Sequence, residues 1–245
     1  MTAPFRILTA GAAALAVATG LSSCATPAPA EVAPAYTAVE PASVGPDPAL
    51  ANGAPTGHYR LDPHHASLVF AVDHLGFSSY VGQFTRFDAA LVIDPADPEA
   101  AELVATIDVS SLMVPAPPEG FLADLLGPQW FNAEVFPEIR FTSTAIVLTS
   151  PSTADVTGNL EFLGAVLPVT FDVVFNGAYP GFAPYDPNAR AGFRAEGSLS
   201  RSAFGMAYGL PPEGTRMGVG DKVKFRIDAE FTGPALEAPA ADPAP

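Results

Sequence analysis

Four histidines, at positions 58, 64, 65 and 74, are the side chains of this sequence best suited to hold a metal ion. Zinc needs three or four His, Cys or carboxylate ligands that converge on one point. His64 and His65 are adjacent, so in a strand they point to opposite faces, and no Cys or Glu stands at ligand spacing beside them. We therefore predict no metal site, and we expect His65 and His74 to satisfy polar groups near the mouth of the fold.

The other residue patterns that could support catalysis are absent or weak. The sequence has no Gly-x-Ser-x-Gly turn, no phosphate-binding Gly-rich loop and no Cys–His pair. Asp94 and Asp97 are close in sequence, but they lie among prolines in a turn, where carboxylates are usually solvated. The glycines between positions 205 and 220 are typical of hairpin connections. We predict that the protein is not an enzyme.

The elements that position these residues are strands. Between Asp221 and Phe231 every second residue is apolar and the residues between them are charged or polar, which is the pattern of a half-buried strand. Further strands are predicted at 67–73, 80–93, 103–109, 139–148, 157–162, 166–175 and 191–199. One short amphipathic helix is predicted over 118–126. About eight strands with turn clusters between them predict an all-β, antiparallel fold, and periodicity alone leaves a barrel and a sandwich open.

The composition excludes some classes of function. The 245 residues include 11 Lys and Arg against 26 Asp and Glu, which gives a formal charge of −15. A nucleic-acid-binding protein needs a basic surface, so that class is excluded. Charged residues make up 15% of the chain and apolar residues 49%, where a soluble domain has about 25% charged residues. This is enough apolar material for a core or for an apolar cavity.

The N-terminus is typical of an export signal. Residues 1–23 hold one cation, Arg6, then an apolar run from Ile7 to Leu21 that is too short and too rich in Ala and Gly to favour a membrane span. The sequence Leu21-Ser22-Ser23-Cys24 resembles the lipobox of bacterial lipoproteins, whose Cys receives a diacylglycerol; a free Cys beside an ordinary cleavage site is the alternative. We expect an exported, periplasm-facing protein anchored to the membrane through lipidated Cys24. In a Gram-negative host, the Ala25 that follows favours the outer membrane.

Two segments rich in Pro and Ala flank the folded part. We expect residues 24–57 to form a disordered, solvated linker after the signal peptide, and residues 234–245 to form a disordered tail. The folded domain is then 58–233, a suitable size for one core. Because Cys24 is the single cysteine, this domain has no disulfide to stabilise it.

A series of motifs in the domain is specific enough to indicate a family. In chain order they are 59–62, 65–76, 82–87, 94–95, 107–111, 130–132, 136–143, 156–160, 168–171, 192–193, 200–206 and 219–223. Together they resemble the YceI-like family of polyisoprenoid-binding proteins, over essentially the whole domain. The resemblance implies a lipocalin-like antiparallel β-barrel around an elongated apolar pore that takes an isoprenoid chain, with no cofactor other than the bound lipid.

The alternation and the motif positions together suggest which side chains meet this ligand. We expect the pore to be lined by Phe70, Val72, Phe84, Phe141, Phe171 and Phe204, and His65, His74 and Arg86 to lie near its polar end. A long apolar ligand is held by burying its surface, at about 25 cal/mol per Å². The 17 Phe residues supply the apolar area for such a tunnel, although core packing alone would also explain them.

The sequence departs from the family pattern at two places. The family has a charged, His-containing stretch where this chain has residues 120–126, and its Leu-His-Gly-Val-Thr turn is replaced here by residues 162–166. We interpret these two departures as an indication that the head group of the ligand is less polar than that of the family's usual ligand. Neutral drift in loops is the alternative explanation.

The leading prediction is a barrel in the cell envelope that binds or carries an isoprenoid lipid, either a quinone or a polyprenyl phosphate. The first alternative is a structural or stress-protective envelope lipoprotein whose barrel is filled by its own side chains and has no ligand. A third is an enzyme that acts on a lipid in the pore, although no nucleophile–base pair supports it. The sequence does not decide whether two copies of the protein form a homodimer.

Overall fold

The computed structural model describes residues 53–182 and 185–236. The predicted signal peptide, the lipidation site Cys24, most of the predicted linker and most of the predicted tail lie outside these residues. All of the predicted strands and the predicted helix lie within them.

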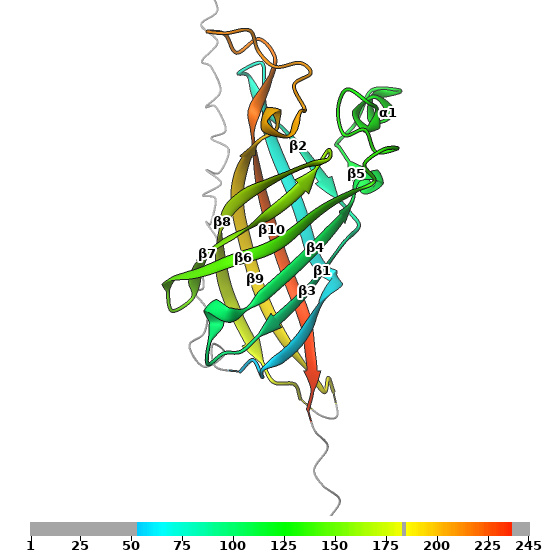
Figure 1. Cartoon of the computed structure of the whole chain (residues 1–245). Helices are drawn as coiled ribbons and strands as arrows, with labels where there is room; N and C mark the ends of the chain where they lie inside the picture. The colour runs from blue at the N-terminus through cyan, green and yellow to red at the C-terminus, as the bar shows by residue number, and fades with distance from the viewer. Residues whose placement is uncertain (1–52, 183–184, 237–245) are drawn as a thin grey trace, which may run out of the picture. The chain divides into compact units, whose positions relative to one another are not determined.

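Ten strands form one antiparallel sheet that closes into a barrel (Figure 1). The order is β10-β9-β8-β7-β6-β4-β3-β1-β2-β5, and the pairing of β10 with β1 closes the ring. The strands are β1 Gly57–His74, β2 Ser78–Phe84, β3 Phe87–Ile93, β4 Glu102–Asp108, β5 Leu112–Met113, β6 Glu138–Ser150, β7 Thr153–Phe162, β8 Ala165–Tyr179, β9 Asn188–Ser200 and β10 Val219–Ala235. The closed ring decides for a barrel and against a sandwich.

Two positions of the barrel are each filled by two short strands. The single strand predicted over 80–93 was therefore wrong, because the chain breaks at Thr85 and Arg86 and forms β2 and β3. β1 pairs with β2 along its second half and with β3 along its first residues, and β3 and β2 pair in turn with β4 and β5. Ser111 joins the two breaks, because its Oγ accepts from the Arg86 N–H at 3.0 Å and donates to the Asp108 carbonyl at 2.7 Å. Counting each interrupted pair once gives eight positions, which confirms the predicted eight-stranded antiparallel barrel.

A large bulge interrupts β1. Leu61 pairs with Phe231 and Ala66 pairs with Ala229, so the four residues between them on β1 stand opposite the single residue Glu230 on β10. Tyr59 and Leu61 are buried before the bulge, and Leu68 and Val72 are buried after it. The bulge therefore changes which sequence positions face inward. For this reason the alternation predicted only the part of β1 from Ser67 onwards, whereas the strand begins ten residues earlier.

The helices of the described residues are short. α1 is Phe121–Leu126, which confirms the predicted helix with a later start, because Gly120 has a left-handed φ of 80° that breaks the turn before it. Three 3-10 helices are η1 Pro98–Ala100, η2 Val109–Ser111 and η3 Ser202–Phe204. None of the helices in the described part of the chain is long and apolar enough to cross a membrane.

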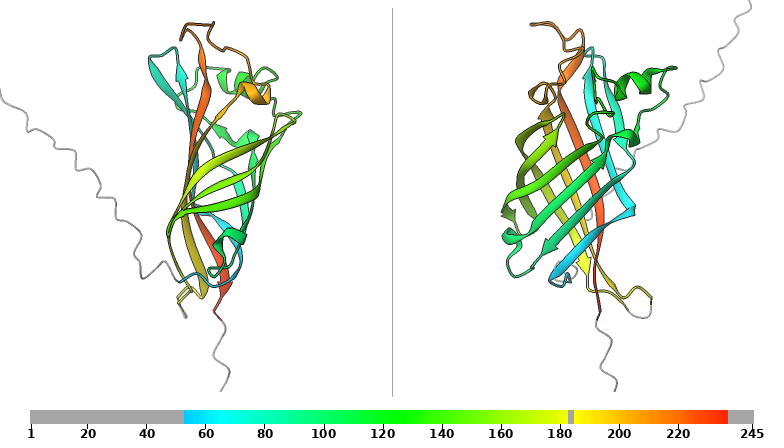
Figure 2. Two further views of the ribbon diagram at one scale, coloured as in Figure 1. Left: turned by 60° about the vertical axis from the view of Figure 1, so that its left-hand side comes forward. Right: turned by 45° about the vertical axis from the view of Figure 1, so that its right-hand side comes forward.

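The two ends of the barrel differ. One end, here called the helix end, carries α1, the β1–β2 turn and the loop 205–218, and both views in Figure 2 place α1 and this loop at the same end. The opposite end carries the start of β1, the β6–β7 turn and the β8–β9 loop (Figure 1).

Candidate functional site: an apolar cavity in the barrel

The interior of the barrel holds a cavity of about 950 Å³. This is near the upper limit of ordinary small-molecule cavities. Its lining residues include exposed side chains at both ends, among them His74 and Pro118 at the helix end and Pro95 and Pro151 at the opposite end. The barrel is therefore not filled by its own side chains.

The side chains that form the wall of the cavity follow the period-two alternation of the strands. Val223, Phe225 and Ile227 of β10 face the cavity, while Lys224 and Arg226 between them face outward and are exposed. On the neighbouring strand β1, Phe70 stands directly opposite Phe225 in the register. The inward positions of successive strands thus form a continuous apolar wall.

The aromatic side chains of the wall form three groups along the barrel. The groups are Phe70, Phe84 and Phe131 towards the helix end, Phe141, Phe171 and Phe225 in the middle, and Phe175, Phe193 and Phe231 towards the opposite end. Within these groups the centroids of neighbouring rings are 5.0–6.3 Å apart. Such rings offer a large apolar surface along the length of the cavity.

Glycines on neighbouring strands leave room for some of these rings. Gly82 is the register partner of Phe70, and Gly197 is the register partner of Phe225. A Cβ on Gly197 would lie 2.6 Å from Phe225 Cζ and 2.7 Å from Phe171 Cβ, and a Cβ on Gly82 would overlap the ring of Phe70. Each ring therefore extends sideways over the glycine of the next strand, and this keeps the lumen open.

Polar side chains meet the cavity at the helix end. Tyr80 packs its ring edge-on against Phe121 of α1, with 6.1 Å between centroids, and burial raises the pKa of its hydroxyl. Trp130 and His74 line the same end. These groups surround the lumen with hydrogen-bonding atoms while their rings add apolar area.

Arg201 is the buried cation of this end, with 2% of its surface exposed. Its guanidinium lies 5.4 Å from the centroid of Trp130. Burial lowers its pKa, and the charge of Asp221 opposes that shift. The guanidinium donates hydrogen bonds of 2.7–2.9 Å to four main-chain carbonyls, those of Met206, Tyr208, Val219 and Gly220. Its hydrogen-bonding capacity is thus largely used to hold the loop 205–218.

Six of the residues expected at the ligand line the cavity. They are Phe70, Val72, Phe84, Phe141, Phe171 and His74. The alternation of β1, β2, β6 and β8 places the five apolar ones, and His74 is the last residue of β1. Their contact with a ligand stays a prediction.

Three expected residues do not lie on the cavity wall. Phe204 is in η3 and is 4% exposed, because its ring packs against Phe162 in the core beside the cavity. Arg86 lies in the break between β2 and β3, where it pairs on the outside with Asp108 at 2.7 Å. His65 lies in the bulge of β1, which turns its side chain outward to solvent.

Some residues that line the cavity were not among those predicted from the sequence. Tyr80 shares its face of β2 with Phe84, so the alternation could have indicated it. Phe121 begins α1, whose predicted amphipathic pattern was not connected with the cavity. Trp130 and Phe131 come from the irregular segment between α1 and β6, which has no period to place them. Nothing in the spacing of Arg201 signals that it is buried.

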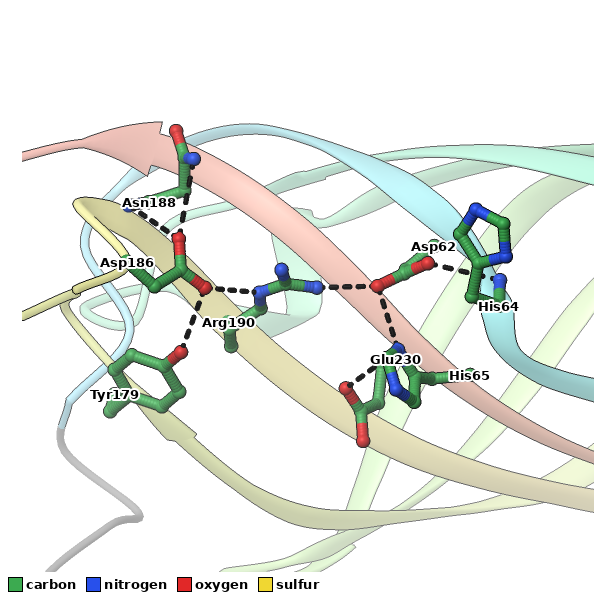
Figure 3. Close-up of polar contacts among 8 residues, drawn as sticks. All are labelled: Asp62, His64, His65, Tyr179, Asp186, Asn188, Arg190 and Glu230. Carbon is green, nitrogen blue, oxygen red and sulfur yellow. Dashed lines mark hydrogen bonds and ion pairs between the residues drawn. The ribbon is translucent and has the colours of Figure 1, made fainter.

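The outward-facing His65 belongs to a polar network on β1, β9 and β10 (Figure 3). Its Nδ1 lies 2.9 Å from Asp62 Oδ2 and 3.9 Å from Glu230 Oε2, so a histidine and two carboxylates come within reach of one another. Glu230 is distant in sequence, so ligand spacing did not indicate it. Arg190 already donates to the same Asp62 oxygen at 2.6 Å and also pairs with Asp186. We interpret the cluster as an ion-pair network that fixes the bulge.

The network shifts the pKa values of its members. The pKa of the Asp62 carboxyl is far below its usual range, through hydrogen bonds from His65, from the His64 main-chain N–H and from Arg190. The pKa of His65 is raised by the hydrogen bond to Asp62 and by the negative charge of Glu230. Both shifts favour the charged pair.

Comparison with known proteins identifies relatives over the whole barrel. The model of the YceI-like domain matches residues 59–231. A UPF0312 protein of Pseudomonas putida (strain GB-1) is 34% identical over 158 residues, which is 64% of this chain and 80% of the relative.

Solved structures share the fold. BcnA of Burkholderia cenocepacia superposes with a TM-score of 0.58 at 24% identity, covering 69% of this chain and 98% of that protein. A polyisoprenoid binding domain from Saccharophagus degradans, described as implicated in plant cell wall breakdown, gives a TM-score of 0.51 at 10% identity and covers 73% and 99%.

Proposed function

Because this chain belongs to the YceI-like family, we propose that its barrel binds an isoprenoid lipid and holds the polyprenyl chain in the cavity. The observation that carries the proposal is the open lumen of about 950 Å³ with its three groups of aromatic side chains. Polyisoprenoid binding is the property for which the S. degradans fold neighbour is named, and this suggests the ligand class.

An isoprenoid tail suits this lumen because both are long and apolar. Each methylene group moved from water into an apolar environment contributes about 0.8 kcal/mol, so binding gains strength with the length of chain that is buried. The lumen offers few hydrogen-bonding partners between its two ends. A ligand with polar groups along its length would lose hydrogen bonds to water without replacing them.

We place the head group at the helix end and assign it a neutral chemistry, such as that of a quinone. Tyr80, Trp130 and His74 supply hydrogen-bonding atoms there. Among the described residues that line this end, the buried cation Arg201 is already bonded to four carbonyls. A diphosphate would need several free cations to replace its hydration.

We further propose that the protein works in the cell envelope. The apolar run, the lipobox-like sequence and the position of Cys24 support export and a lipid anchor that faces the periplasm. Mass spectrometry of the protein isolated from its membrane tests this. A diacylglyceryl group on an N-terminal Cys24 is expected, and an unmodified chain that begins elsewhere would contradict it.

Lipid extraction tests the proposed ligand. The protein is purified from its native cells without detergent exchange, and the bound lipids are extracted and identified by mass spectrometry. We expect a prenyl lipid in near-stoichiometric amount. A protein that comes without lipid and also takes up no added isoprenoid would contradict lipid binding and favour a structural role.

A second measurement tests the head group. Titration with a quinone and with a polyprenyl diphosphate of equal tail length compares the two chemistries at constant apolar area. Tighter binding of the quinone is expected, and a clear preference for the diphosphate would refute the neutral head group without refuting the tail site.

A further inference from the structure

Three large apolar side chains project into solvent from the β1–β2 turn and the loop 205–218 at the helix end. Phe77 in the β1–β2 turn is 81% exposed, and Tyr208 and Met217 in the loop 205–218 are 51% and 63% exposed. We call these three residues the apolar tip. Phe182 and Tyr185 in the β8–β9 loop at the opposite end are exposed too, but none of the described residues in the range 176–192 lines the cavity. Apolar side chains exposed together in one patch mark a contact surface more often than single exposed ones do.

The two loops of the tip are bound to each other. The Leu75 N–H donates to the Gly218 carbonyl at 2.9 Å, and Arg216 pairs with Asp73 at 2.6 Å. Within the β1–β2 turn, the Phe77 N–H donates to the His74 carbonyl at 3.0 Å. These bonds hold the β1–β2 turn and the loop 205–218 side by side (Figure 1). The exposure of Phe77 and Met217 is therefore built into the fold.

The tip continues the apolar surface of the cavity. Tyr208 packs edge-on against Trp130, with 5.4 Å between ring centroids, and Trp130 lines the cavity. His74 and Val219 line the cavity too, and each lies within three residues of a tip residue in the sequence. A ligand that leaves the lumen at this end meets apolar side chains first.

The tip carries little charge although the chain as a whole is strongly acidic. Residues 205–218 contain one acid, Glu213, and one base, Arg216, and the turn 75–79 contains neither. A partner is therefore recognised here by burial of apolar side chains, with little electrostatic attraction.

The chain before the barrel is long enough to turn the tip towards the membrane that would carry Cys24. The 28 residues from Ala25 to Asn52 reach up to about 85 Å at roughly 3.1 Å per residue. The chain enters β1 at the opposite end, and the 18 residues of β1 extend at most about 60 Å. The tether therefore exceeds the length of the barrel.

From these observations we propose that the apolar tip inserts into the surface of a lipid bilayer, and that cargo passes between the bilayer and the cavity at this end. The passage of cargo rests on the proposed function, whereas the docking of the tip does not.

Vesicle flotation tests the docking. Residues 25–245, which include every described residue and lack the anchor, are mixed with phosphatidylcholine vesicles. The bound fraction is compared for the wild type, the tip variant Phe77→Ser/Met217→Ser, and a control, Val147→Ser/Val166→Ser, which changes two comparably exposed residues of the barrel wall. We expect the tip variant to bind on the order of tenfold more weakly and the control to bind as the wild type does, with little effect of salt.

Fluorescence gives a local readout because Trp130 is the only tryptophan. Brominated lipids should quench its emission in the wild type and in the control, and much less in the tip variant. Equal vesicle binding by wild type and tip variant would overturn the proposal. A wild type that self-associates through the tip and ignores vesicles would overturn it as well, because the tip would then be a protein interface.

Two further measurements distinguish a failure of the docking proposal from a failure of the proposed function. A short-chain quinone added without vesicles should bind the tip variant as tightly as it binds the wild type, while transfer of quinone from vesicles should be slower in the variant. Vesicle docking by a protein that binds no isoprenoid would refute the proposed function and leave the docking supported.

Discussion

The width of the lumen depends on which residues lie beside each inward-facing aromatic ring. Gly197 accommodates the ring of Phe225 from β10 and the Cβ of Phe171 from β8 at the same point. The sequence shows these glycines and rings but not which of them meet, because their contact depends on the register between strands that are distant in the chain.

Gly197→Ala should therefore push the ring of Phe225 into the lumen. We expect a loss of about 1–3 kcal/mol in the free energy of unfolding, together with weaker binding of isoprenoids. Gly192→Ala is the matched control on β9, since a Cβ there would find its nearest atom at 3.7 Å. Chemical denaturation and lipid titration of both variants measure the two effects; equal behaviour of the variants would contradict the role of Gly197.

His65 should make stability depend on pH. Its pKa is raised above the usual 6.5, mainly by the hydrogen bond to Asp62, so protonated His65 stabilises the folded state. This contribution is fully present below pH 6.5 and is lost as the pH rises through the raised pKa. The carboxylates of Asp62 and Glu230 and the guanidinium of Arg190 face His65 throughout this range.

The comparison of His65→Ala with wild type tests this sign. The destabilisation of the variant should be larger near pH 5 than near pH 9 in unfolding measurements at both values. His64→Ala is the control, because His64 bonds Asp62 through its main-chain N–H and its side chain takes no part. A destabilisation by His65→Ala that does not change with pH would contradict the interpretation.

Strands with an uninterrupted alternation were predictable from the sequence, and irregular segments were not. The alternation of β10 identified its inward face directly, since one side of the strand faces the cavity and the other faces water. The bulge of β1 was not predictable, because its four residues oppose one residue of a strand that lies at the other end of the chain. For the same reason the outward position of His65 could not be predicted from the sequence.

The helix α1 contributes to the mouth of the cavity, and this leads to a prediction on exchange kinetics. Phe121→Ala removes an edge-on contact with Tyr80 that is worth about 0.5–1.5 kcal/mol, so release of bound lipid should accelerate by up to roughly tenfold. Leu122→Ala on the same helix is the control, since Leu122 packs on the core and does not line the cavity. Stopped-flow release measures both; equal release rates in the two variants would argue against a gating role of Phe121.

Closure of the sheet into a barrel creates the cavity. The pairing of β1 with β10 turns a set of half-apolar strands into a tube, and the wall residues then enclose about 950 Å³. The eight-stranded barrel followed from the strand number and from the family resemblance. The size of the lumen could not be predicted in this way, because it depends on aromatic rings that lie along the wall instead of across the lumen.

A binding series with quinones that share one ring and differ in the number of isoprene units tests whether the cavity holds the lipid tail. If the cavity holds the tail, affinity should rise with each added unit, by no more than about 0.8 kcal/mol per buried methylene, and should level off once the lumen is full. Affinity that does not change with tail length, or that rises without limit, would contradict a tail site of this size.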